Sequence, residues 1–328
     1  DIDLDGEQEI MIGNEVHSPD GTVEWTHDVL GDYGHWGAFV NVDGDDEGEV
    51  ISVGASRIGI YEHDGAEITL IDTPDAAQPG PICVADFDGD GTVEMAWSSR
   101  SVFGMYELDG TQVWTQVVQD LTGVAGCSGY DVNGDGVFEI LFADETTFRI
   151  YDGATGLVRY EQGGHSSGTV FEYPVIADVD ADGSAEVAIV SNFHASDWGT
   201  LTVFGHGGDG WMESGATWPV HDFAVTNVLP DGTIPTDPEP YWITHNVYRS
   251  RPAVDTAAAN LRVEITDVCV SGCTEEVGIA RVAVAVWNDG ASPIDAEVPV
   301  TVFALDGGVL TPLSTQTVAS VPAGTRLP

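Results

Sequence analysis

Five short acidic loops carry the side chains of this sequence that could do chemistry. They are DIDLDGEQE (1–9), NVDGDDEGE (41–49), DFDGDGTVE (86–94), DVNGDGVFE (131–139) and DVDADGSAE (178–186). The shared template, D-x-D-x-D-G-x-x-E, places oxygen-bearing side chains at positions 1, 3, 5 and 9 around a glycine that permits a sharp turn. Clustered oxygen ligands suit a hard cation, so the loops predict about four to five Ca²⁺ ions per chain.

An EF-hand shares the first half of this loop but does not fit. It needs a bidentate glutamate at position 12 and a helix on each side. Position 12 holds Ile12, Ser52, Trp97, Phe142 or Ile189. The segments after the loops, such as EVISVG and EILFA, are short apolar runs with β-branched residues, which predict buried strands.

The loops belong to a longer repeat, because their starts are separated by 40, 45, 45 and 47 residues. A second apolar segment follows each predicted strand, and then comes an Asp-Gly pair, at Asp20, Asp64, Asp109 and Asp152. Asp-Gly between alternating strands is a strong hairpin signal. Each unit is therefore predicted to be an antiparallel meander of about four strands, the size of one propeller blade.

The pattern over residues 1–252 resembles the FG-GAP/VCBS repeat propellers, which include the head of integrin alpha subunits. In that family the loop joins the innermost strand of a blade to the second strand. Calcium is bound there by side chains at loop positions 1, 3, 5 and 9 and by the backbone carbonyl at position 7. The resemblance implies these side-chain ligands: Asp1, Asp3, Asp5, Glu9; Asn41, Asp43, Asp45, Glu49; Asp86, Asp88, Asp90, Glu94; Asp131, Asn133, Asp135, Glu139; and Asp178, Asp180, Asp182, Glu186. The implied carbonyl ligands belong to Glu7, Glu47, Thr92, Val137 and Ser184.

Two copies depart from the pattern. The second loop has Asn41 at its first position and Asp46 in place of glycine, so we expect this site to be the weakest. In a sixth copy, FAVTNVLPDGT, Leu229 cannot ligate, and we expect an inner strand with a metal-free loop. The sequence begins inside the first loop with no inner strand before it. Either a preceding segment or another part of an assembly is expected to supply that strand, and a complete ring is expected to have six or seven blades.

The charge balance limits the partners. The chain has 55 acidic and 9 basic residues, for a net charge of −46. Nucleic acids and anionic membrane surfaces both attract basic patches, so neither is expected as a partner. A solvated acidic surface or adaptation to high salt would account for the surplus. No run of 18 apolar residues predicts a membrane span. Calcium loops suit millimolar calcium, which favours an extracellular or cell-surface location.

The four cysteines form two pairs. Cys269 and Cys273 are close in sequence and are predicted to form a disulfide at the end of a strand. Cys83 and Cys127 occupy equivalent places before the third and fourth loops. We interpret them as buried free thiols, with a bridge between adjacent blades as the alternative.

The pattern changes near residue 250. Residues 260–328 alternate apolar and polar side chains between glycine and proline turns, which predicts a β-sandwich. The segment resembles the CARDB and Ig-like modules of bacterial surface proteins. Only about four or five strands are predicted, so the sandwich is expected to be incomplete and to leave an edge that a partner strand could fill.

Catalytic patterns are weak. Gly164–Gly168 matches G-x-S-x-G, but a strand is predicted after it where a nucleophile elbow needs a helix. The fifth unit carries an insertion with Asn192, His194, Asp197 and Trp198, which forms either a ligand-binding loop or an ordinary long loop.

The sequence thus predicts an all-β protein, a calcium-stabilised propeller followed by an Ig-like sandwich. We expect a non-catalytic role in adhesion or surface assembly, with protein or glycan partners and self-assembly into filaments through open strand edges. A carbohydrate-binding lectin, or a polysaccharide lyase or hydrolase built on a propeller, remains the alternative.

Overall fold

The computed structural model describes residues 1–27, 36–73, 79–191, 200–206, 211–253, 261–269, 281–288, 298–306, 309–318, 320–321 and 325–327. Strands dominate these residues, and their one helix is α1 (Tyr241–Thr244). The chain divides into two compact units, Asp1–Ala253 and Val254–Pro328.

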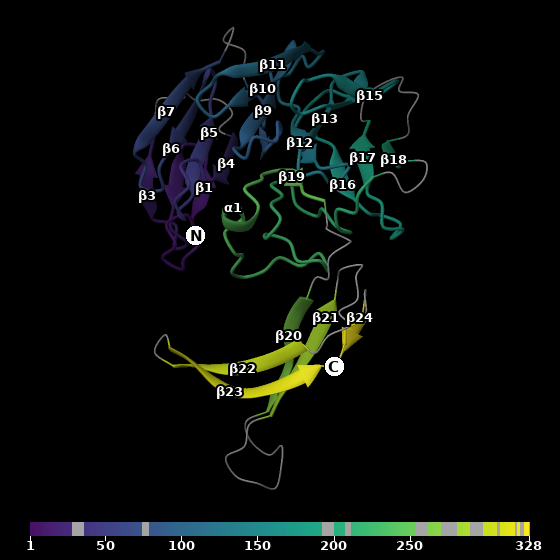
Figure 1. Cartoon of the computed structure of the whole chain (residues 1–328). Helices are drawn as coiled ribbons and strands as arrows, with labels where there is room; N and C mark the ends of the chain where they lie inside the picture. The colour runs from purple at the N-terminus through teal and green to yellow at the C-terminus, as the bar shows by residue number, and fades with distance from the viewer. Residues whose placement is uncertain are drawn as a thin grey trace. The chain divides into compact units, whose positions relative to one another are not determined.

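The first unit contains five antiparallel sheets that follow one another around an arc, as in a β-propeller (Figure 1). The first sheet contains β1 (Ile10–Ile12), β2 (Glu15–His17) and β3 (Val23–Thr26). The second contains β4 (Trp36–Val40), β5 (Glu49–Val53), β6 (Arg57–Tyr61) and β7 (Glu67–Asp72). The third contains β8 (Cys83–Ala85), β9 (Glu94–Ser98), β10 (Val102–Glu107) and β11 (Gln112–Val117). The fourth contains β12 (Cys127–Tyr130), β13 (Glu139–Ala143), β14 (Thr147–Tyr151) and β15 (Val158–Gly163), and the fifth contains β16 (Val175–Ala177), β17 (Glu186–Val190) and β18 (Leu201–Phe204).

The predicted hairpins are confirmed at the four Asp-Gly pairs that begin at Asp20, Asp64, Asp109 and Asp152. Each lies between the last two strands of its sheet. In the third sheet the Oδ1 atom of Asp109 accepts the Thr111 N–H at 2.8 Å, and Gly110 has a φ of 87°. That left-handed conformation favours glycine and recurs at Gly21 and Gly65, whereas the left-handed glycine of the fourth turn is Gly156 and not Gly153.

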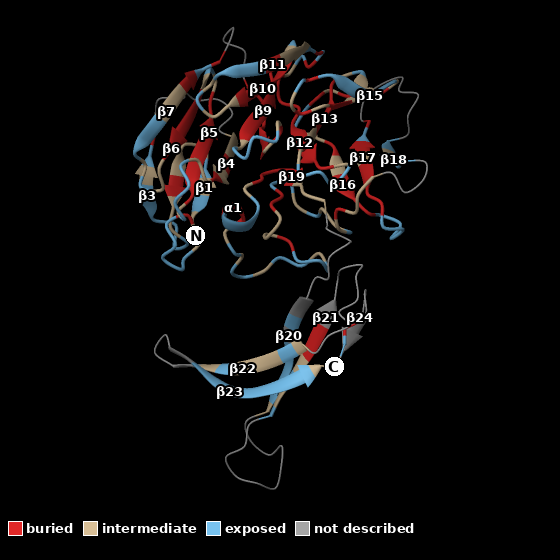
Figure 2. Cartoon of the chain, viewed as in Figure 1, coloured by how far each residue is buried: buried red, intermediate tan, exposed pale blue. Residues whose placement is uncertain are grey.

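The core lies between neighbouring blades. β5 and β9 are buried along their whole length because a blade packs on each face, whereas the outermost strand β15 is exposed throughout (Figure 2). Aromatic side chains join the blades: the rings of Phe103 in β10 and Phe142 in β13 stack with centroids 4.4 Å apart. Continuous apolar runs in the sequence therefore mark strands buried on both faces.

A disulfide joins Cys83 in β8 to Cys127 in β12, the inner strands of two adjacent blades. The prediction of free thiols at these positions is wrong. The two Cα atoms lie 5.5 Å apart, which is within bonding range once the inner strands converge.

The predicted sixth copy does not form an inner strand. Residues 222–233 contain turns and bends, and a long segment from residue 211 to residue 253 lies across the opening of the arc (Figure 1). Its end crosses three blades. Asn246 bonds to the backbone of Asn41, Tyr248 pairs with Val84, and β19 (Ser250–Arg251) pairs in parallel with β12. The proline-rich stretch and Leu229 had already marked this copy as degenerate.

The second unit is also built of strands. One sheet contains β20 (Leu261–Cys269), β21 (Arg281–Asn288) and β24 (Thr325–Leu327), and the other contains β22 (Val298–Asp306) and β23 (Val309–Val318). Within each of these two sheets, all described strand pairings are antiparallel. The Ig-like or CARDB class stays a prediction. Cys269 is disulfide-bonded, and Cys273 lies outside the described residues.

Candidate metal-binding loops

The acidic loops have similar backbone conformations, and the second loop differs at one position. Four of them join the innermost strand of a sheet to its second strand, as the resemblance implies, and the first precedes β1. Position 4 is left-handed in every loop, at Leu4, Gly44, Gly89, Gly134 and Ala181. Position 6 is also left-handed in the four loops where it is glycine. The two left-handed residues coil the backbone so that the acidic side chains converge.

The loop aspartates are held in place by backbone N–H groups. In the third loop, Asp86 accepts the Gly91 N–H at 3.0 Å, Asp88 accepts the Asp90 N–H at 3.1 Å, and Asp90 accepts the Thr92 N–H at 2.8 Å. Equivalent bonds to the first position recur in the first, fourth and fifth loops. Local hydrogen bonds to the backbone therefore orient these aspartate side chains within their loops.

The glutamate at position 9 is oriented by the same device in all five loops, because one of its oxygens accepts the N–H of position 2. The donor–acceptor distance is 2.7 Å for Glu94 and 2.9 Å for Glu186. Glu49 and Glu94 are completely buried, and the Oε1 atom of each has no hydrogen-bond partner among the described residues. A buried carboxylate oxygen without a donor is costly unless a cation lies beside it.

Burial also changes the acidity of these glutamates. Desolvation raises the pKa of Glu94 to about 8, and it raises that of Glu49 and of Glu139 to about 7. Coulomb repulsion from Asp88 and Asp86 adds to the effect at Glu94. The loops thus concentrate negative charge around a partly dry centre, which is the environment that a hard cation stabilises.

The predicted ligands converge to different degrees. Asp86, Asp88, Asp90 and Glu94 each place a carboxylate oxygen within 4.8 Å of the others. Three-membered groups of this kind contain Asp1, Asp3 and Asp5; Asp43, Asp45 and Glu49; and Asp178, Asp180 and Glu186. Glu9 of the first loop and Asp182 of the fifth loop do not belong to these groups. The fourth loop forms no such group among the described residues, and its third position is Asn133, an amide in place of a carboxylate. Ligation by the carbonyls at position 7 stays a prediction.

The second loop has a different internal arrangement. The Nδ2 atom of Asn41 donates to the carbonyl of Asp45, and Oδ1 accepts the Gly44 N–H at 2.7 Å. Asp46 is not left-handed, in contrast to the glycine at this position in the other loops. The Nδ2 group of Asn41 is a donor, so Asn41 offers a cation one oxygen where Asp86 offers two, which gives a physical reason for the weaker site expected here.

Neighbouring loops are joined to one another through their backbones. Gly48 donates to the carbonyl of Ile2 at 2.8 Å, and Phe138 donates to that of Asp86 at 3.3 Å. Between the fourth and fifth loops, Met212 donates to Val132 and accepts from Ala185. Backbone hydrogen bonds thus link the first loop to the second, the third to the fourth, and, through Met212, the fourth to the fifth.

The other two predicted sites are the insertion in the fifth unit and the G-x-S-x-G match. The insertion with Asn192, His194, Asp197 and Trp198 lies outside the described residues. Residues 164–169 form neither helix nor strand, and β16 comes next, so the G-x-S-x-G match lacks the helix of a nucleophile elbow. The ring of His165 in this stretch is buried, and its Nδ1 atom lies 2.9 Å from the Oγ atom of Ser191.

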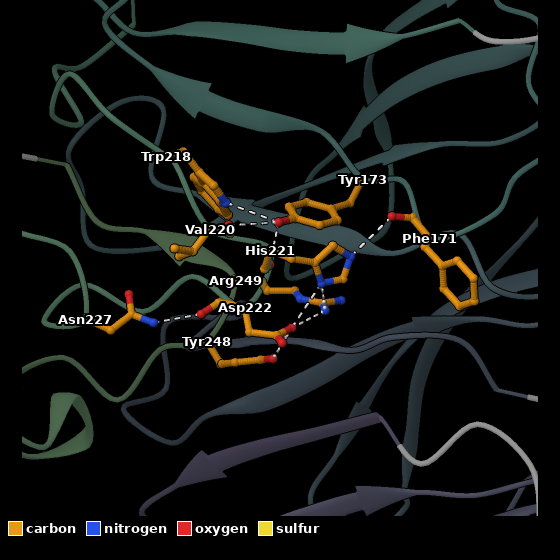
Figure 3. A network of polar contacts seen from close by, with 9 residues as sticks. All are labelled: Phe171, Tyr173, Trp218, Val220, His221, Asp222, Asn227, Tyr248 and Arg249. Atoms are coloured by element: carbon orange, nitrogen blue, oxygen red, sulfur yellow. Dashed lines mark hydrogen bonds and ion pairs between the residues drawn. The ribbon is translucent and has the colours of Figure 1, made fainter. Parts of the chain in front are cut away.

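A polar network that the sequence reasoning missed surrounds Arg249 in the segment that crosses the arc (Figure 3). The Nη2 atom of Arg249 lies 2.6 Å from the Oδ1 atom of Asp222, which also accepts the Tyr248 hydroxyl at 3.0 Å. Hydrogen bonds from His221, Arg249 and Tyr248 hold the pKa of Asp222 well below its usual range. The only signal in the sequence was the rarity of basic residues in this acidic chain.

Among the described residues, no helix is long and apolar enough to cross a membrane.

Comparisons with protein families and with curated proteins find no match. Among solved structures, the biofilm matrix protein Bap1 of V. cholerae is similar over 77% of this chain and 70% of that chain, with 18% identity and a TM-score of 0.66. BBS1N in complex with ARL6DN covers 90% of this chain and 94% of its own, with 11% identity and a TM-score of 0.41. BamB from Moraxella catarrhalis covers 62% and 59%, with 15% identity and a TM-score of 0.36. The similarity to Bap1 is one of fold.

Proposed function

We propose that this chain is an extracellular, calcium-stabilised propeller of the FG-GAP/VCBS type that acts without catalysis in adhesion or in the assembly of a surface matrix. The observation that carries the proposal is the third loop. It brings four carboxylates within 4.8 Å of one another around Glu94, whose buried Oε1 atom has no hydrogen-bond partner among the described residues.

The donor set fits calcium. All the side-chain ligands proposed for the five loops are carboxylate or amide oxygens, and histidine and cysteine are absent from the loops. Zinc and other borderline metals favour nitrogen and sulfur, whereas Ca²⁺ takes oxygen ligands in a flexible geometry. Bound calcium would neutralise the clustered carboxylates and supply the missing partner of Glu94. The site residues themselves orient the loop and hold adjoining strands together.

A structural role for the metal is supported by the repetition of the loop. The same hydrogen bond, from the glycine at position 6 to the aspartate at position 1, recurs in the first, third, fourth and fifth loops. A catalytic metal keeps an open position beside a distinctive acid or base, whereas a structural one is enclosed by its ligands. An extracellular setting is supported by the disulfide between Cys83 and Cys127.

Adhesion is supported by the similarity to Bap1, a biofilm matrix protein. The second unit, with its two antiparallel sheets, suits the role of an Ig-like or CARDB module that follows the propeller in the sequence. Protein or glycan surfaces are the partners that fit this reading, because the net charge of −46 disfavours polyanions in general.

Two measurements test the proposal. Elemental analysis of the purified chain after dialysis is expected to give at least about two calcium ions per chain, and a lower count would refute the calcium assignment. Retention of the chain on a surface coated with biofilm polysaccharide is expected in excess calcium and is expected to fall in chelator. Release of shortened sugar products from the same surface would instead identify an enzyme.

A further inference from the structure

In the second and third blades, a glutamate outside the acidic loop stands opposite the glutamate at loop position 9. β10 pairs with β9 so that Glu107 lies directly across from Glu94. In the second blade, the register of β5 and β6 brings Glu62 opposite Glu49 in the same way. Side chains directly opposite each other in an antiparallel pair project from the same face of the sheet. These two residues, the opposing glutamates, therefore add a carboxylate that the nine-residue motif does not contain.

The opposing glutamates lack a basic partner. Like charges directly opposite each other destabilise an antiparallel pair, and an arginine could offset the repulsion. No described arginine forms an ion pair with Glu62 or Glu107. The hairpin fixes the backbone of each glutamate: Glu107 donates to Thr111 and accepts from Gly110, each at 2.9 Å, and Glu62 has equivalent bonds. A cation between the two carboxylates of each pair would offset the repulsion.

The opposing glutamates also lie beside the aspartates at loop positions 3 and 5. Desolvation raises the pKa of Glu107, and repulsion by Asp88 and Asp90 raises it further. Desolvation and the aspartates at the same two loop positions likewise raise the pKa of Glu62. The interaction with the same two positions places both opposing glutamates on the same side of their loops.

The same two blades contain buried glutamate oxygens without a partner. Glu49 and Glu94 are 0% exposed, and the Oε1 atom of each has no hydrogen-bond partner among the described residues. Within the described part of the chain, the glutamates at position 9 of the other three loops have no such oxygen. A buried carboxylate oxygen without a donor indicates a cation beside it.

The other three blades differ at the place of the opposing glutamate. In the first and fifth blades the equivalent residues are Ser18 and Gly205. The fourth blade has Asp152, whose carboxylate pairs with Arg159 and accepts the Thr155 N–H at 2.9 Å. The opposing glutamate and the unpartnered oxygen at position 9 therefore occur together, in the same two blades.

We propose that Glu107 binds the cation of the third loop and that Glu62 binds the cation of the second, each as a ligand additional to the motif. The inference rests on the proposed function, because it requires calcium in these loops. Ca²⁺ takes about six to eight oxygen ligands, so the motif leaves room for another carboxylate. Glu107 is not among the four carboxylates within 4.8 Å of one another, so ligation requires a rotation of its side chain towards the loop. In the second site, Glu62 restores the fourth carboxylate that Asn41 removes.

Calcium titration of the full chain in competition with a chromophoric chelator tests the assignment. Glu107→Gln keeps the size of the side chain but removes its charge, and we expect the calcium affinity of one site to fall about tenfold. Glu62→Gln should weaken another site to a similar degree, and the double replacement should weaken two. Glu67→Gln, at an exposed position of β7, is the matched control and should bind calcium as the unmodified chain does. An unchanged titration curve for either Glu107→Gln or Glu62→Gln would overturn the assignment of that residue.

A second replacement in the third loop locates the effect of Glu107. Asp88→Asn removes the charge of a proposed ligand from that loop. If Glu107 binds the same ion, Glu107→Gln should reduce the calcium-induced rise in melting temperature by less in the Asp88→Asn chain than in the unmodified chain. Equal reductions in the two chains would show that the residues act independently, and would reject a shared ion.

Melting temperatures in chelator separate ligation from a structural role. Without calcium, Glu107→Gln removes a like charge opposite Glu94, so its melting temperature should equal or exceed that of the unmodified chain. An equal decrease in calcium and in chelator would show that Glu107 stabilises the hairpin itself, and would overturn the proposal. A chain that holds calcium but is insensitive to both replacements loses this inference alone, whereas one that fails the elemental analysis loses the proposed function.

Discussion

Replacing Glu94 by glutamine should reverse its effect on stability according to whether calcium is present. Glutamine retains an oxygen for the Phe87 N–H, a bond that is 2.7 Å long in the structure, but removes the charge from the cluster with Asp86, Asp88 and Asp90. The comparison is made above pH 8, where Glu94 is ionised because burial raises its pKa to about 8. In chelator, two ionised carboxylates within 4.8 Å of each other repel by at least about 0.9 kcal/mol in water and by about four times that at an effective dielectric constant of 20. Glu94→Gln should then be as stable as the unmodified chain or more stable.

In calcium the order should invert. A ligand at a hundredfold excess over its dissociation constant stabilises the folded state by about 2.7 kcal/mol per site. Loss of the third site should therefore lower the melting temperature by roughly 5 to 10 °C for a unit of this size. Differential scanning calorimetry of both chains, in excess calcium and in chelator, measures the two differences.

The control is Glu67→Gln, which changes the same residue type at an exposed position of β7 and should leave both melting temperatures unchanged. An equal decrease for Glu94→Gln in both solutions would refute the reasoning, because it would mean that Glu94 stabilises the blade through its hydrogen bond and not through a cation.

Three further results are expected. Gly136 has a φ of 87°, and an added methyl group would meet nothing within 4 Å, so Gly136→Ala should destabilise the unit by about 1 kcal/mol through backbone strain alone. Gly163→Ala is the control, because Gly163 lies in equally open space without a positive φ and its replacement should have no such effect. Equal effects of the two variants in denaturant titrations would contradict this. Replacing Cys83 and Cys127 together by alanine should cost about 4 kcal/mol, measured in the same way, since the disulfide closes a loop with a sequence separation of 44. Burial lowers the pKa of His165 below its usual value of 6.5 in the folded chain. As the pH falls below 6.5, the unfolded chain therefore takes up the proton first, and the free energy of unfolding decreases until the pH reaches the lower pKa of the folded chain. His165→Asn should lose less stability than the unmodified chain between about pH 7 and pH 5, and an equal loss in the two chains would contradict the prediction.

Local and repeated features were predictable from the sequence. The acidic loops and Asp-Gly hairpins depend on residues a few positions apart, such as Asp109 and Gly110, and each recurs at a nearly fixed period. The buried strands were predictable because a blade packed on both faces requires a continuous apolar run, as in β5 and β9.

Features that depend on long-range packing were not predictable. The disulfide between Cys83 and Cys127 requires that two inner strands approach, a distance that spacing in sequence does not fix. The network of Asp222 and Arg249 lies in the segment where the repeat has decayed, so no periodicity pointed to it. Leu229 correctly indicated a degenerate copy, but it could not show that the segment crosses the arc as coil and turns.

The crossing segment has a mechanical consequence. In an array where each repeat touches only its neighbours, unfolding can begin at any unit and spread. Here Asn246, Tyr248 and Ser250 in turn engage the inner strands of three successive blades. Separating one blade from the others must therefore break these contacts of the crossing segment. A single proteolytic cut within that segment would let the blades unfold one after another under load, where the intact segment requires them to unfold together.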